Sequence, residues 1–179
     1  MTWPSRRVNV VLLAVLAGAT AGLLVLRRTL RTKGGAAAVS ANKEIVRRIV
    51  DGVWRDRDLT IIDQLIAEEY VGHDPTQPEP IRGRDGFRQF VGIYLSAFDD
   101  ASVTIDDQIA EGDQVVTRWT GRGTHTGELM GIAPTGKEVT VSGLTVSRIA
   151  GGKVAEEWEL MDALGMLVQL GAVPQPTTA

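Results

Sequence analysis

The spacing of apolar residues changes once along this chain, close to Asp100, and that change limits the folds available to it. Before Asp100, apolar side chains recur every three or four residues, which predicts helices. After it, short runs rich in valine and threonine are separated by glycine turns, which predicts strands. Helices followed by antiparallel strands indicate an α+β domain, in which a curved sheet wraps around a packed helix and encloses a pocket.

Three helices are expected before Asp100. The first begins at Asn42, which can cap a helix, and the second, shorter one begins at Asp58 and includes Ile66. A proline-rich loop follows over residues 73–80. The third helix has the clearest apolar face, which should form the pocket floor. That face consists of Phe87, Phe90, Val91, Tyr94, Leu95 and Phe98.

Four strands are expected after Asp100. They span residues 101–110, 114–123, 137–149 and 153–161, with a glycine-rich loop over 123–136. A short terminal helix over 163–170 should end at Gly171. The folded domain is therefore expected to span residues 42–174, with a short tail over 175–179.

The first forty residues have a different composition. Val8 to Leu26 is an uncharged run of nineteen residues with two arginines on each side. A helix of that length would be about 28 Å long, close to the thickness of the bilayer core. We therefore expect a retained membrane anchor over residues 1–33, and a flexible linker over 34–41. The alternatives are a cleaved signal peptide and a buried core helix. The positive-inside rule favours a cytoplasmic body by a narrow margin.

The composition of the remaining chain excludes several classes of function. Beyond residue 41 there are 13 basic and 22 acidic residues, a net charge of −9, which argues against binding to a nucleic-acid backbone. The chain has no cysteine and two histidines, so thiolate chemistry is excluded and a metal site is not expected. No phosphate-binding glycine loop and no G-x-S-x-G motif is present. General acid–base chemistry remains.

Asp162 is the leading catalytic candidate from the residue pattern. On a regular strand, Trp158, Leu160 and Asp162 share one face with the apolar Val154, so Asp162 would end a row that faces the pocket. Burial there would raise its pKa and suit it to proton abstraction. The alternative is that Asp162 caps the final helix. The neighbouring glutamates Glu156, Glu157 and Glu159 are expected to form a solvated cluster on the strand.

Four other polar or aromatic positions are weaker candidates. His125, in a glycine-flanked loop, could polarise a carbonyl group, or could be an ordinary turn residue. His73 could line the pocket mouth, and Arg118 could bind an oxyanion if it points inward. Trp119, beside Arg118, is expected with Trp158 among the pocket residues.

Four segments of the chain resemble the SnoaL-like polyketide cyclases, a group that includes ester cyclases of the nuclear transport factor 2-like superfamily. The segments are YVGHDP, IRGRDGFRQF, GTHTGELMGIAPTGKEV and GKVAEEWELMDALGMLVQLG. The resemblance implies a cone-shaped α+β fold with three helices on a curved antiparallel sheet, often dimeric through that sheet. It also implies aldol-type ring closure without metal or cofactor, with an aspartate near the end of the last strand as acid–base. The matching aspartate here is Asp162.

The expected function is a cofactor-independent cyclase or isomerase acting on a hydrophobic, polyketide-like carbonyl compound. Asp162 would remove a proton, and His125 or Arg118 would stabilise the enolate oxygen. The alternatives are a membrane-tethered module that binds a ligand or partner without catalysis, and hydration of an epoxide.

Overall fold

The computed structural model describes residues 35–174. Contacts divide the chain into Met1–Ala38 and Val39–Ala179, and the sheet and the cavity described below belong to the second unit. The expected membrane-spanning run Val8–Leu26 lies outside the described residues. Within residues 35–174, no helix is long and apolar enough to cross a membrane.

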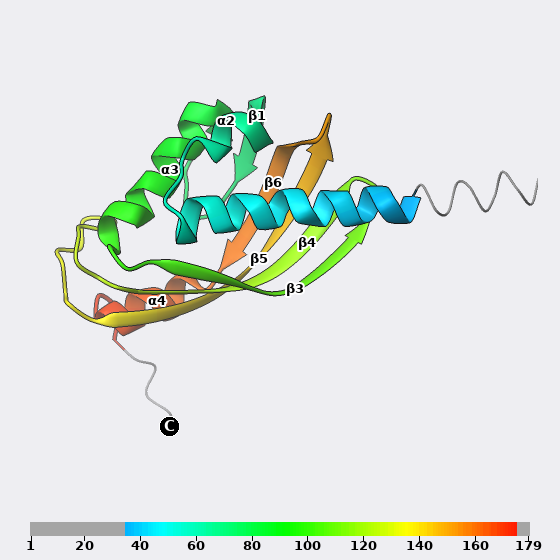
Figure 1. Ribbon diagram of the computed structural model, residues 1–179. Coiled ribbons are helices and arrows are strands. Elements are labelled where there is room, and N and C mark those ends of the chain that lie inside the picture. The colour runs from blue at the N-terminus through cyan, green and yellow to red at the C-terminus, as the bar shows by residue number, and fades with distance from the viewer. Residues whose placement is uncertain (1–34, 175–179) are drawn as a thin grey trace, which may run out of the picture. The chain divides into compact units, whose positions relative to one another are not determined.

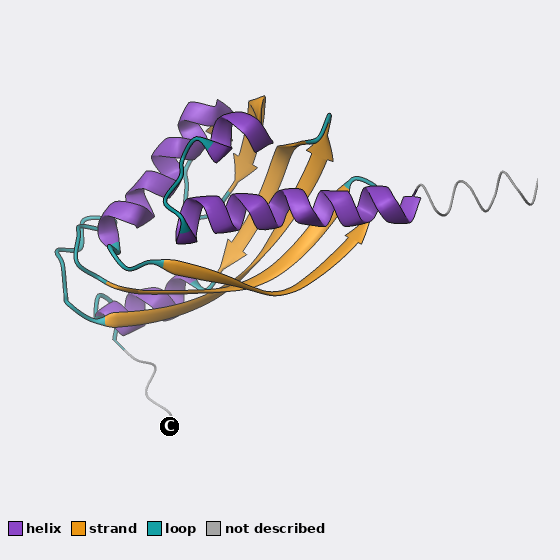
Figure 2. Cartoon of the chain, viewed as in Figure 1, coloured by secondary structure: helices purple, strands orange, loops and turns teal. Residues whose placement is uncertain are grey.

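Helices and one curved sheet form the described part of the chain, as expected from the sequence (Figures 1 and 2). A helix over residues 35–50 runs into a π-helical turn, η1 (Asp51–Arg55). It is followed by α2 (Ile61–Leu65), α3 (Gly83–Ala97) and the terminal α4 (Ala163–Leu170). Residues 35–41, where a flexible linker was expected, are helical, because alanine is the strongest helix former.

The sheet has six strands in the order β2-β1-β6-β5-β4-β3. The four expected strands are β3 (Ser102–Glu111), β4 (Gln114–Thr124), β5 (Glu138–Ala150) and β6 (Lys153–Met161). The sequence reading missed β1 (Ile66–His73) and β2 (Ile81–Arg82). The sheet is also mixed rather than wholly antiparallel, because β1 pairs with β6 in parallel.

A β-bulge in β6 decides which side chains of this strand face inward. Ile149 pairs with Val154, and the adjacent Arg148 pairs with Glu156, so Ala155 is an extra residue in β6. Because alternate residues point to opposite faces, one inserted residue exchanges the faces of everything that follows. Val154 is fully buried, whereas Trp158 and Leu160 are exposed.

Two apolar clusters cover the inner face of the sheet. The larger packs the first helix, α2 and α3 against β1, β4, β5 and β6, with Val53, Ile62 and Val154 fully buried. The smaller lies between the end of α3, the loop after β4, and α4. Between them, side chains from the first helix, α3 and the sheet enclose a cavity.

Candidate active site

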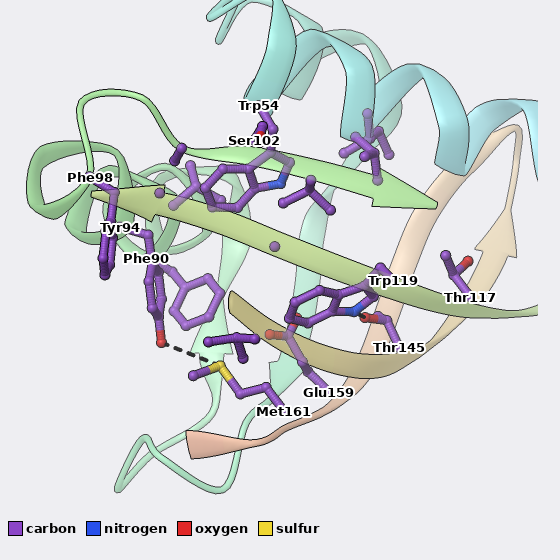
Figure 3. A pocket seen from close by; sticks show the side chains of 18 of the residues that line it. Trp54, Phe90, Tyr94, Phe98, Ser102, Thr117, Trp119, Thr145, Glu159 and Met161 are labelled. Atoms are coloured by element: carbon purple, nitrogen blue, oxygen red, sulfur yellow. Dashed lines mark hydrogen bonds between the residues drawn. The ribbon is translucent and has the colours of Figure 1, made fainter. Parts of the chain in front are cut away.

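The cavity has an empty volume of about 1080 Å³, including the solvent at its mouth. Its helical wall is largely apolar and comes from the first helix, η1 and α3, including Trp54, Phe87, Phe90, Tyr94 and Phe98 (Figure 3). The opposite wall is the inner face of β3 to β6, which adds polar side chains. The result is a pocket that is apolar on one side and carries hydrogen-bonding groups on the other.

A polar row crosses this inner face from strand to strand. Gln108 pairs with Thr117, Thr117 with Thr145, and Thr145 with Glu159, on β3, β4, β5 and β6 respectively. We call these four residues the polar row. Gln108 Nε2 donates to Thr117 Oγ1 at 3.1 Å. Trp119 Nε1 donates to Thr145 Oγ1 at 2.9 Å.

Glu159 is the carboxylate of the polar row, and it lines the cavity beside Thr145 and Trp119 (Figure 3). Burial, with the Glu157 and Asp74 carboxylates nearby, raises the pKa of Glu159 to about 8. A carboxyl group with such a pKa can exchange a proton near neutral pH, as a general acid or base must.

Glu157 lies on the same face of β6, two residues before Glu159. Its carboxylate accepts hydrogen bonds from Ser147 Oγ at 2.6 Å and Tyr70 Oη at 3.0 Å. Burial raises the pKa of Glu157, and these two hydrogen bonds oppose the increase. Burial also raises the pKa of Tyr70, with a further contribution from Glu157. The Glu157 carboxylate is thus held in place by its partners, unlike that of Glu159.

Asp74 directly follows β1 and is buried. Its Oδ1 accepts the backbone N–H of Thr76 at 2.7 Å, and its Oδ2 is buried without a hydrogen-bond partner among the described residues. Its negative charge contributes to the raised pKa values of Glu159 and of Tyr94, although burial is the larger cause for both.

Asp162 does not line the cavity. It is the N-cap of α4, and its Oδ1 accepts the backbone N–H of Gly165 at 2.8 Å. The inward row of Trp158, Leu160 and Asp162 was therefore wrong, since the bulge at Ala155 turns Glu157, Glu159 and Met161 inward instead. Glu157 and Glu159, expected on a solvated face, were the functional candidates that the sequence reading missed. They share a face with Met161, but nothing in the sequence marks the bulge.

Of the six residues expected to line the pocket, Phe90, Tyr94 and Trp119 do so. The other three, His73, Arg118 and Trp158, belong to the outer face of the sheet. Trp158 is 39% exposed, and the His73 ring stacks on it with centroids 5.3 Å apart. His73 Nε2 also lies 3.0 Å from Glu156 Oε1.

Arg118 and His125, the expected enolate stabilisers, both lie outside the cavity lining. Arg118 is exposed and forms an ion pair with Asp106 at 3.0 Å. His125 is fully buried beneath the loop after β4, where its Nδ1 accepts the backbone N–H of Thr135 at 3.2 Å. The glycine-flanked loop therefore folds over His125 rather than presenting it to a ligand. No group of three potential metal-binding side chains occurs within residues 35–174.

The family model for SnoaL-like polyketide cyclases matches residues 44–170. The chain belongs to the SnoaL-like polyketide cyclase family. Aklanonic acid methyl ester cyclase DnrD of Streptomyces peucetius is 27% identical over 141 residues, which make up 78% of this chain and 96% of DnrD.

Solved structures of similar proteins support the same fold for this SnoaL-like chain. TsrD from Streptomyces laurentii is 29% identical, with a TM-score of 0.67 over 75% of this chain and 97% of TsrD. A nuclear transport factor 2-like protein from Burkholderia pseudomallei K96243 is 18% identical, with a TM-score of 0.61 over 73% of this chain and 97% of the Burkholderia chain. The expected nuclear transport factor 2-like fold is confirmed.

Proposed function

We propose that this protein is a cyclase that closes a ring by intramolecular aldol addition within a hydrophobic, polyketide-like carbonyl compound, with Glu159 as the acid–base residue. The observation that carries the proposal is a carboxyl group with a pKa of about 8 in the wall of a largely apolar cavity. Family membership and the similarity to a cyclase of aklanonic acid methyl ester support it.

The proton transfers of the reaction balance with the carboxylate and the substrate alone. Glu159 removes a proton from the carbon next to one carbonyl, and the resulting enolate attacks a second carbonyl of the same molecule. One carbon–carbon bond forms, and the proton returns from Glu159 to the new alkoxide. The product is an isomer of the substrate. The apolar helical wall excludes water from the enolate.

Two substitutions separate catalysis by Glu159 from catalysis by Asp162. With aklanonic acid methyl ester as substrate, Glu159→Gln should lower turnover by about 10²–10⁴-fold, the usual contribution of general acid–base catalysis. Asp162→Asn should leave turnover unchanged, because asparagine caps a helix as well as aspartate does. Product formation is measured by liquid chromatography with mass detection.

A second readout does not depend on knowing the natural substrate. In D₂O, the wild-type protein should accelerate exchange of the α-protons of 1-tetralone, a rigid aryl ketone, and Glu159→Gln should abolish the acceleration. A wild-type protein that binds 1-tetralone but neither exchanges its protons nor converts the ester would favour the ligand-binding module over the cyclase.

We also propose that the protein is a homodimer through the outer face of the sheet. Four large apolar side chains are exposed on this face, namely Ile109, Leu144, Trp158 and Leu160. Two ion pairs, Arg118 with Asp106 and Arg148 with Glu156, lie on the same strands. A second copy of the chain would cover the apolar residues, and opposite charges near them permit a self-complementary contact.

For residues 1–33 we propose a single-pass membrane anchor that leaves the catalytic domain on the cytoplasmic side. The uncharged run between pairs of arginines supports the anchor. The full-length protein should stay in the membrane fraction after a carbonate wash. A mature N-terminus at Gly22 or Asn42 would contradict it.

A further inference from the structure

A carbonyl group that loses an α-proton needs a hydrogen-bond donor at its oxygen, because negative charge develops there. The structure removes His125 and Arg118 from that task, since neither lines the cavity. Thr145 occupies the position next to Glu159. The two residues are direct cross-strand partners on β5 and β6, and both line the cavity.

The hydrogen bond with Trp119 determines whether the Thr145 hydroxyl acts as a donor or as an acceptor towards a ligand. The indole N–H is only a donor, so Thr145 Oγ1 accepts the 2.9 Å hydrogen bond from Trp119 Nε1. The hydroxyl hydrogen of Thr145 must therefore be donated elsewhere. Within residues 35–174, Thr145 Oγ1 makes no other side-chain hydrogen bond. A ligand oxygen in the cavity can accept that hydrogen.

The spacing of Thr145 and Glu159 fits a carbonyl group together with its α-carbon. Side chains of directly opposed residues have Cβ atoms about 4.5–5.5 Å apart. The carbonyl oxygen and the α-hydrogen of a ketone are separated by three bonds, so adjacent side chains can reach both ends of the same unit.

We propose that Thr145 is a catalytic residue that donates a hydrogen bond to the carbonyl oxygen of the substrate, and that Trp119 is the positioning residue that orients it. The inference rests on the proposed cyclase function and assigns its missing enolate donor. Accepting a hydrogen bond from Trp119 also strengthens the donor capacity of the Thr145 hydroxyl, because hydrogen bonds in a chain polarise one another.

The test uses the full-length protein and two probes of the same shape: 1-tetralone with a ¹³C-labelled carbonyl, and tetralin, which lacks the oxygen. Calorimetry measures the affinities, and infrared spectroscopy measures the carbonyl stretch of bound 1-tetralone. Thr145→Val removes the hydroxyl at constant shape, and Thr145→Ser retains it. Thr140→Val is the matched control, because Thr140 is an exposed threonine on the same strand.

In the wild-type protein, the carbonyl stretch should move to lower frequency than in Thr145→Val. The valine variant should bind 1-tetralone about 2- to 12-fold more weakly, the contribution of one net hydrogen bond, and tetralin with unchanged affinity. Thr145→Ser should restore the wild-type frequency. Trp119→Phe should bind 1-tetralone with a smaller frequency shift, since the hydroxyl loses its orienting partner.

Three results would overturn the proposal: wild-type protein that does not bind 1-tetralone, the same carbonyl frequency in wild type and Thr145→Val, or an equal loss of tetralin affinity in that variant. These outcomes are independent of proton exchange. A normal frequency shift, with neither α-proton exchange nor conversion of the ester, would contradict the cyclase function and retain Thr145 as a ligand-binding donor.

Discussion

At the scale of single residues, surroundings assign different roles to three carboxylates close together in the chain. Glu157 is held by Ser147 and Tyr70, and Asp162 is held by the first turn of α4. Glu159 faces the cavity, where burial raises its pKa to about 8. Residue type alone does not distinguish them, so the role follows from position.

The raised pKa of Glu159 predicts a pH dependence of stability. Between the ordinary glutamate pKa of 4.5 and about 8, the folded protein keeps a proton that the unfolded chain has released. Raising the pH through this window therefore lowers the free energy of unfolding. Glu159→Gln should weaken this decline, so the variant should gain stability relative to wild type between pH 5 and pH 8. Urea unfolding at both pH values measures the difference. An equal fall in the free energy of unfolding from pH 5 to pH 8 in the variant and in wild type would contradict the assignment.

Catalysis should depend on pH in the opposite sense. The base form of Glu159 becomes more abundant as the pH rises towards about 8. The rate of α-proton exchange in 1-tetralone should therefore rise about tenfold per pH unit below that value and level off above it. A rate that is constant between pH 5 and pH 9 would exclude Glu159 as the base.

At the scale of helices and strands, sequence reasoning succeeds where pairing is local and fails where it is distant. The antiparallel strands β3 to β6 follow one another along the chain and were expected close to their observed bounds. β1 was missed because Leu59, Ile62 and Ile66 have helical spacing. Its partner β6 lies more than eighty residues further on, and such distant pairing overrides local preference.

The same reasoning explains what was predictable of the site. The aromatic residues of α3 have a clear helical period, and Phe90 and Tyr94 line the cavity. The choice between the two faces of β6 depends on one inserted residue, Ala155. A bulge is a property of pairing between strands, so period-two counting along one strand does not reveal it.

α3 offers a test of this wall through two phenylalanines. Phe87 is buried and meets the Tyr70 ring edge to face, with centroids 5.3 Å apart, whereas Phe90 is half-buried. Phe87→Ala should cost about 3–5 kcal/mol. Phe90→Ala should cost less, because part of its surface contacts no protein. Urea unfolding measures both, and equal losses would mean that the two side chains are equally packed.

At the scale of the whole molecule, one sheet serves two purposes. Its inner face carries the polar row and the cavity, and its outer face carries the exposed apolar residues. The dimer proposed above would use the outer face without covering the cavity lining. Catalysis and assembly would then be separable by mutation.

Leu160→Asp tests this separation. Leu160 is 64% exposed on the outer face, so the substitution should leave folding intact and place a charge inside the proposed interface. Light scattering should then report half the wild-type mass, while α-proton exchange in 1-tetralone persists. An unchanged mass would contradict a dimer through this face.

The bulge at Ala155 acts on β6 much as a single inserted nucleotide acts on a coding sequence. Everything after it is read in the other frame: Glu157 and Glu159 face the cavity, and Trp158 and Leu160 face out. A regular β6 of the same sequence, without the bulge, would instead present a tryptophan and a leucine to the cavity and two carboxylates to the outer face of the sheet. In this protein a backbone irregularity, rather than a particular side chain, decides which residues of β6 line the cavity and which lie on the outer face.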